Sequence, residues 1–316
     1  DLVGNYEGSC SAAVQADGKI VVAGFASTGS NVDFALARYN TDGTLDTSFN
    51  GSGLVRTDIG GGYDMLRAMT LQADGRILVT GFATVGSDEM LCVVRYNADG
   101  TLDTSFNGTG IVVSNLTPGH DEAYDIAVLA DGRIVVGGEA GGGFAAARYN
   151  ADGTLDTSFS GTGWVVTRPG ATSMAGRAMA VQTDGRIVVG GMAALSGSTQ
   201  FTLVRYLADG SLDSSLQGTG IVTTVVANDA AITGVPLSVT VQGDGKILIA
   251  GYASGASTPN HGALLRYNAD GSLDTGFGPC VPWSGEILTT FKNGSPAKPA
   301  GGVQVFDAEL SASNNF

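Results

Sequence analysis

The sequence has little positive charge, few cysteines and histidines, and no long apolar run. Only 16 of its 316 residues are Lys or Arg, against 30 Asp or Glu, which gives a formal net charge of −14 and a pI near 4.3. Binding to nucleic acid or to an anionic membrane surface needs clustered Lys and Arg, so we expect neither. No segment reaches the length of about 18 apolar residues that membrane insertion requires.

Cysteine and histidine are too sparse to form a metal framework. No two of Cys10, Cys92 and Cys280 have the spacing of zinc ligands, and Cys92, within MLCVV, is expected in the core. Cys10 and Cys280 lie near opposite ends of the chain, where a fold that closes on itself would bring them together. A disulfide between them is a hypothesis that implies an oxidising compartment. His120 and His261 are expected in surface loops.

Glycine and apolar residues are abundant instead. The chain has 49 Gly, 43% hydrophobic residues and only 15% charged residues, against a typical charged share of about 25%. This balance favours short apolar strands joined by tight turns and is unlike that of a disordered chain.

Two motifs each recur five times. The first is Asp-Gly, then Lys or Arg, then an apolar run that ends in Gly, as in ADGRILVTG from Ala73. Its copies begin at Ala16, Ala73, Ala130, Thr183 and Gly243. The second motif is RYNADGTLDTSFNGTG, from Arg95 to Gly110. Its copies begin at Arg38, Arg95, Arg148, Arg205 and Arg266. Because the two motifs recur in phase, one unit with a period of 53–61 residues accounts for almost the whole chain.

Each unit has the pattern of four strands. In the second unit the runs RAMTLQ, ILVTGFA, MLCVVRYN and GIVVSNL are rich in Val, Ile and Leu and are bounded by turn residues. Asp-Gly between the first two runs favours a tight hairpin. A single four-stranded sheet cannot bury both of its faces, so the units must stack on one another. We therefore predict an all-β fold: a five-bladed β-propeller of four-stranded antiparallel blades, with a C-terminal extension.

The predicted propeller covers residues 1–291, and residues 292–316 form a linker with a possible extra strand. The repeats are predicted at about 5–59, 60–116, 117–170, 171–228 and 229–291. The strand order resembles that of the WD-repeat blade, in which the first strand lines the central channel. By that analogy the channel side carries Ala13, Thr70, Ala127, Ala180 and Thr240 or their neighbours.

The paired motifs resemble the delta-60 repeat family, repeats found in large bacterial surface and secreted proteins. The resemblance covers roughly residues 5–290. It implies a propeller-like fold and an extracellular or cell-surface location, and it implies no catalytic activity. The fourth copy departs from the family pattern at Leu207, Leu216 and Gln217, and the fifth shortens after Phe277.

Arg95 and Asp103 are the candidate structural pair of the second motif. Asp103 has the position of a cap on a single helical turn, and Arg95 is expected to pair with Asp103 or with the equivalent Asp of the next blade. The same roles are expected for the arginines Arg38, Arg95, Arg148, Arg205 and Arg266 and for the aspartates Asp46, Asp103, Asp156, Asp213 and Asp274.

Cation binding is the alternative role for this loop. Asn97, Asp99 and Asp103 supply hard oxygen ligands, loosely like a calcium loop, although the bidentate Glu of strong sites is missing. Their equivalents are Asn40, Asp42, Asp46, Asn150, Asp152 and Asp156. Turn and cap chemistry is the other interpretation. No other cofactor is expected.

Function is expected in the irregular segments, because the most regular residues recur in every blade. These segments are the loops 27–32, 84–89, 194–200 and 254–262 and the tail 292–316. In the tail, the run GVQVFDAEL could cover the edge of its own sheet, or it could pair with a second molecule and build a homo-oligomer or filament.

The interpretation favoured by the near-identical blades is a non-catalytic extracellular or cell-surface scaffold that binds protein or glycan. The alternative is an extracellular carbohydrate-active enzyme or a lectin that uses the channel. Carboxylates expected at one end of the channel could serve glycoside hydrolysis: Glu7, Asp64, Asp121 and Glu122. A chain that opens at Asp1 without Met suggests a processed or excised piece.

Overall fold

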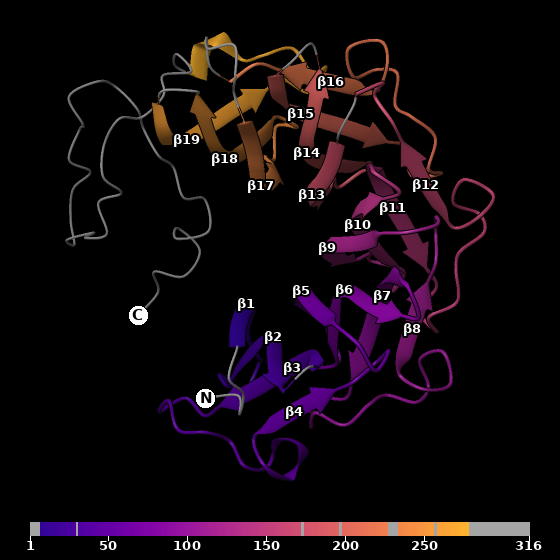
Figure 1. Ribbon diagram of the computed structural model, residues 1–316, viewed down its shortest axis with the longest axis vertical. Helices are drawn as coiled ribbons and strands as arrows, with labels where there is room; N and C mark the ends of the chain where they lie inside the picture. The colour runs from indigo at the N-terminus through magenta and orange to yellow at the C-terminus, as the bar shows by residue number, and fades with distance from the viewer. Residues whose placement is uncertain are drawn as a thin grey trace.

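The structure is a computed structural model that describes residues 7–29, 31–171, 174–195, 198–226, 233–255 and 258–277. Within these ranges the chain forms five antiparallel sheets and two short 3-10 turns, η1 (Phe49–Gly51) and η2 (Thr275–Phe277). Neither of these turns is long or apolar enough to cross a membrane, nor is any other helix within the described part of the chain. The sheets follow one another around a common centre (Figure 1).

Each sheet is one blade. Blade 1 comprises β1 (Glu7–Val14), β2 (Ile20–Thr28), β3 (Asn31–Tyr39) and β4 (Leu54–Thr57). Blade 2 comprises β5 (Asp64–Leu71), β6 (Ile77–Val85), β7 (Asp88–Tyr96) and β8 (Ile111–Ser114). Blade 3 comprises β9 (Asp121–Val128), β10 (Ile134–Ala140), β11 (Gly143–Tyr149) and β12 (Trp164–Thr167). Blade 4 comprises β13 (Met174–Val181), β14 (Ile187–Leu195), β15 (Ser198–Tyr206) and β16 (Ile221–Thr224). The described part of blade 5 comprises β17 (Thr233–Val241), β18 (Ile247–Gly255) and β19 (Thr258–Tyr267).

The strands of each blade pair in chain order, so the topology is a simple meander. The first strand of every blade (β1, β5, β9, β13 and β17) faces the centre, and the fourth strand lies at the periphery (Figure 1). The prediction of an all-β, five-bladed propeller is therefore confirmed. The predicted C-terminal extension and any fourth strand of blade 5 lie outside the described residues.

The core is divided among the junctions between blades. Phe34 and Phe49 of blade 1 pack with Leu66, Ile77 and Tyr96 of blade 2, and each later junction has its own apolar cluster. The tyrosine of the RYN motif reaches back to the preceding blade: the hydroxyls of Tyr96 and Thr57 are 2.6 Å apart. Both faces of blades 2, 3 and 4 are thus buried, which explains their nearly continuous apolar strands.

The hairpin turns follow from the Asp-Gly dipeptide. Gly75 has a φ of +85°, a conformation that glycine adopts without steric cost. The turn is closed by hydrogen bonds from Gln72 N to Arg76 O and from Gly75 N to Gln72 O. The residues expected to face the channel all lie on the innermost strands. Of these, Ala13, Ala127 and Ala180 pack partly against the cores between blades.

Candidate functional site at the inner edge of the blades

The two repeated motifs meet at one aspartate in each blade, which is buried in blades 1 to 4. In blade 2, Asp103 Oδ2 accepts from Arg95 Nε at 2.7 Å and lies 3.0 Å from Arg76 Nε, the basic residue of the first motif. Asp103 Oδ1 accepts from the amide and hydroxyl of Ser105. The aspartate of every other blade likewise has two basic partners, at N–O distances between 2.7 and 3.0 Å. These pairs of partners are Lys19 and Arg38 for Asp46, Arg133 and Arg148 for Asp156, Arg186 and Arg205 for Asp213, and Lys246 and Arg266 for Asp274.

The arginine of this cluster also joins neighbouring blades. Arg95 Nη1 donates to the carbonyl of Ala151 in blade 3 at 2.7 Å, and its guanidinium lies 4.5 Å from the ring centre of the fully buried Phe106. Burial opposes ionisation of Asp103, but Ser105 and Arg95 hold its pKa below the usual value. The carboxylate partner of Arg95 is thus in its own blade, and the contact with the next blade is made to a carbonyl.

The candidate calcium residues already have internal donors. Asp99 Oδ1 accepts from Thr101 N at 3.0 Å and from Thr101 Oγ1 at 2.6 Å, while Asn97 Nδ2 donates to the same hydroxyl. The equivalent aspartates Asp42 and Asp152 make the same two contacts with Thr44 and Thr154. A cation would have to compete with these donors. Calcium binding by this loop stays a prediction.

A different feature breaks the repetition at the centre of the molecule. Every innermost strand contains a register shift against the second strand of its blade. The last glycine of the first motif lies opposite the shift, and in blade 2 a Cβ on Gly81 would lie 1.9 Å from Met65 O. The corresponding approaches at Gly24, Gly138, Gly191 and Gly251 are 1.9–2.2 Å. The motif therefore requires glycine because the bulge brings two backbones together.

The bulge leaves one residue of each innermost strand without a partner in the ladder. These five residues, which we call the inner ring, are Cys10, Arg67, Tyr124, Arg177 and Leu237. Their positions in the repeat are equivalent, but only the two arginines are alike. Cys10 is exposed and Leu237 is 62% exposed, whereas the other three are half-buried.

Tyr124 is at the middle of the polar part of the inner ring. The guanidinium carbons of Arg67 and Arg177 lie 5.3 and 5.1 Å from the centre of its ring, and Arg177 Nη1 lies 3.2 Å from its hydroxyl. Burial raises the pKa of Tyr124, and the negative charge of Glu122 adds to this effect. The tyrosine is therefore a neutral hydroxyl held between two cations.

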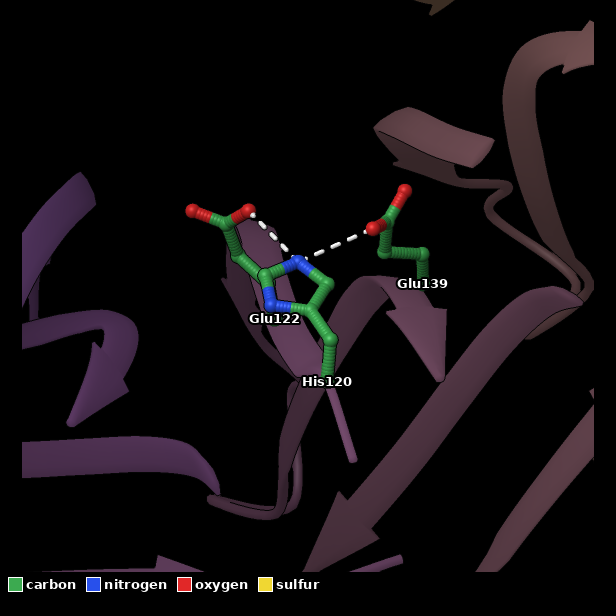
Figure 2. Close-up of side chains that lie close together, drawn as sticks. All are labelled: His120, Glu122 and Glu139. Carbon is green, nitrogen blue, oxygen red and sulfur yellow. Dashed lines mark ion pairs between the residues drawn. The ribbon is translucent and has the colours of Figure 1, made fainter. Parts of the chain in front are cut away.

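Three glutamates and one histidine extend this group. His120 Nε2 lies 3.3 Å from Glu122 Oε2 and 2.9 Å from Glu139 Oε1, and its Nδ1 contacts Glu89. Figure 2 shows the imidazole between Glu122 on β9 and Glu139 on β10. The hydrogen bonds to Glu122 and then Glu139 outweigh the effect of burial and raise the pKa of His120 to about 10. His120 is therefore protonated at neutral pH.

Glu122 connects the histidine to the inner ring. Its side chain is only 2% exposed and pairs with Arg67. Burial opposes ionisation, but His120, Tyr124 and Arg67 together hold the pKa of Glu122 below the usual value. The arrangement offers guanidinium donors, a phenolic hydroxyl and fixed carboxylates to a polar ligand. His120, Glu122 and Glu139 each offer one ligand atom, and these three atoms lie within 4.8 Å of one another. The three residues could therefore hold a transition metal in place of the imidazole proton.

Sequence reasoning expected His120 in a surface loop and treated it apart from the carboxylates. His120 does lie in the connection before β9, with its side chain 35% exposed, but its packing against Phe82, with ring centres 5.7 Å apart, and its three acidic neighbours were not predicted. A Glu two residues after the histidine and another at the end of the next strand were the available signal. Asp64 and Asp121 are fully buried at the starts of β5 and β9, and Asp64 accepts from backbone amides there.

Several expected features fall outside the described part of the chain. They are Cys280, the tail 292–316 and the side chains of Glu7 and His261. The loops 27–32, 194–200 and 254–262 are described only in part. A disulfide between Cys10 and Cys280 therefore stays a prediction.

The sequence matches the family described as a beta-propeller domain of unknown function (DUF5122) five times, at residues 15–49, 72–106, 129–159, 182–216 and 242–277. The chain belongs to this family. Each match runs from the hairpin turn of the first motif to the aromatic or Leu residue of the second. All five inner-ring residues lie outside the matched segments.

Solved structures with similar folds include two enzymes. A thermostable family-43 glycoside hydrolase has a TM-score of 0.44 and 13% identity, covering 90% of this chain and 97% of that one. A gluconolactonase from Xanthomonas campestris has a TM-score of 0.40 and 16% identity, covering 86% and 76%. Similarity of this degree carries no inference about activity. No curated protein matches the sequence.

Proposed function

We propose that the protein is a non-catalytic, extracellular or cell-surface binding module whose ligand contacts the inner ring. One observation carries the proposal: the bulged position bears a different chemical group in most blades, although the surrounding residues repeat. A rigid repeated scaffold that presents a few varied side chains at equivalent positions is suited to recognition. The segments that define the family form the scaffold, and the varied positions lie between them.

The ligand class is a glycan, and acidic sugars are expected to bind better than neutral ones. Arg67 is already paired with Glu122. Among the described residues, the Arg177 guanidinium contacts the Tyr124 hydroxyl and the face of the tyrosine ring, and its Nε has no hydrogen-bond partner. A planar guanidinium that is not paired with a carboxylate suits a sugar carboxylate or vicinal hydroxyls. A protein ligand with an exposed acidic side chain is the other partner that this chemistry can accept.

A glycan array tests this proposal. We expect binding of the wild type to acidic glycans and at least a tenfold weaker signal for Arg177→Gln. Arg168→Gln is the matched control, because Arg168 is exposed and donates to Gly141 O, away from the inner ring. Equal signals from both variants, or no glycan signal from the wild type, would refute the glycan proposal.

The alternative is a carbohydrate-active enzyme. It is favoured by the close approach of Glu122 and Glu139, since retaining glycosidases place two carboxyl groups about 5 Å apart. A general acid, however, needs a raised pKa, and the surroundings of Glu122 lower its pKa. A hydrolase screen on the same protein sample distinguishes the two functions: turnover that is lost in Glu139→Gln would establish the enzyme.

Two further features belong to this proposal. The first is the secreted location that the resemblance to delta-60 repeats implies. It is tested by locating the protein in cell fractions. Assembly into a homo-oligomer or filament through residues 292–316 is tested by removing that tail and measuring the molar mass by light scattering. An unchanged mass would exclude the tail as an assembly element.

A further inference from the structure

Three aspartates meet at the junction between blades 1 and 2, away from the inner ring. Asp33 lies on β3, Asp58 follows β4, and Asp64 begins β5. One carboxylate oxygen from each lies within 4.8 Å of the other two. The three residues therefore bring together the third strand of blade 1, the connection between the blades and the first strand of blade 2.

Asp33 has an unsatisfied oxygen at this junction. Its side chain is only 1% exposed, and its Oδ2 pairs with Arg56. Its Oδ1 is buried without a hydrogen-bond partner. Leaving a buried carboxylate oxygen unpaired is unfavourable, and burial raises the pKa of Asp33. The site thus lacks one positive partner.

The next junction shows which of these carboxylates the fold needs. Asp121 is the blade 3 equivalent of Asp64, and both accept two backbone amides from the preceding connection: Ile59 and Gly60 donate to Asp64, and Leu116 and Thr117 donate to Asp121. The positions equivalent to Asp33 and Asp58 are Met90 and Asn115. Asp64 is therefore part of the common architecture, whereas Asp33 and Asp58 are additions specific to the first junction.

We propose that Asp33, Asp58 and Asp64 form a Ca²⁺ site that joins blades 1 and 2. Three carboxylates face one guanidinium there, which leaves two excess negative charges for a divalent cation to balance. Carboxylate oxygens are ligands that Ca²⁺ accepts, and water completes its coordination. Asp103 of the RYN motif differs in this respect, because its Oδ2 already faces two arginines.

The proposed site resembles the calcium sites of extracellular modules in its modest ligand set. Such sites have dissociation constants of about 0.1–1 mM. Ca²⁺ would connect the segment after β4 to the start of β5 and so stabilise the first blade junction. The site is independent of the inner ring, and its test does not depend on the glycan ligand.

Calorimetry and thermal melting with and without Ca²⁺ test the proposal. Wild-type protein stripped with EDTA is expected to bind one Ca²⁺ at this site. A Ca²⁺ concentration a hundredfold above the dissociation constant should raise Tm by about 5 °C. Asp33→Asn should abolish binding. Asp58→Asn removes only an exposed carboxylate, so the fold is retained, and it should weaken binding at least tenfold.

Asp17→Asn is the matched control, because Asp17 is an exposed aspartate in the turn between β1 and β2 and belongs to neither candidate calcium site. It should leave calcium binding unchanged. The proposal is overturned if the wild type shows neither binding heat nor a rise in Tm. It is equally overturned if Asp58→Asn keeps the wild-type affinity, or if Asp17→Asn loses binding.

Discussion

Replacing Arg95 with Met tests whether the repeated Arg–Asp cluster holds the blades together. Arg95 donates to Asp103 Oδ2 at 2.7 Å, to Ala151 O at 2.7 Å and to Ser105 Oγ at 3.2 Å. Met retains part of the apolar contact with Phe106 but none of these hydrogen bonds. The substitution therefore removes two hydrogen bonds within the blade and one between blades at once.

The expected loss follows from the burial of Asp103, which is about 95% inaccessible. Removing one partner of a buried ion pair costs about 3–5 kcal/mol. Arg76 remains 3.0 Å from Asp103, so the expected loss for Arg95→Met is at the lower end, about 3 kcal/mol. For a domain of this size that corresponds to a fall in Tm of about 6 °C or more.

Thermal and urea unfolding of matched variants provide the assay. Arg168→Met should lose less than about 0.5 kcal/mol, because Arg168 is exposed. Arg95→Lys keeps the charge but cannot reach both Asp103 and Ala151, so its loss should be intermediate. In a double-mutant cycle with Asp103→Asn we expect a coupling of about 1–3 kcal/mol. Equal losses for Arg95→Met and Arg168→Met, or no coupling to Asp103, would refute this reasoning.

Three further predictions concern single positions. Gly81→Ala should lower the free energy of unfolding by about 1–3 kcal/mol, because the added Cβ would meet Met65 O. Gly243→Ala is the control and should be nearly neutral, because a Cβ there would lie in open space. The midpoints of urea unfolding measure the difference between the two variants. The pKa of His120 is raised from 6.5 to about 10. The stabilisation of the fold by protonated His120 is therefore complete below pH 6.5 and is lost as pH rises towards 10. The Tm difference between wild type and His120→Gln should therefore shrink over that interval. Burial disfavours the charged form of Asp156, but Ser158 and Arg133 hold its pKa well below 3.8. The stabilisation of the fold by the ionised Asp156 is therefore complete above pH 3.8 and is lost on further acidification. The stability of Asp156→Asn should accordingly fall less steeply with decreasing pH than that of the wild type.

The repeated part of the fold was readable from the sequence. Runs such as ILVTGFA have strand composition, the Asp-Gly dipeptide defines the hairpin, and the shared period of the two motifs defines the blade. The second cation on Asp103 was not predicted. Arg76 and Asp103 are 27 residues apart, and only the strand pairing of β6 with β7 brings the first motif beside the second.

The inner ring was not predicted either, for a related reason. A bulge adds one residue to a strand without changing its composition, so RAMTLQ gives no sign that Arg67 is the unpaired residue. The sequence signal was the last glycine of the first motif, because a regular strand pair does not require glycine at that position. Five glycines at one position of the repeat indicate five close backbone approaches, and the bulged residues beside these approaches are the ones that differ.

Regularity and irregularity therefore have different physical roles in this chain. The Arg–Asp cluster and the motif glycine recur because each blade must be joined to the next in the same way, and the geometry tolerates no substitute at the bulge. The bulged side chain is not constrained in this way, because it has no partner in the ladder. At Asp33 the same logic applies: Met90 occupies the equivalent place in blade 2, so the carboxylate is not required by the fold. Positions where a repeat departs from its own pattern at an energetic cost, as Asp33 does, are where a ligand offers the physical explanation.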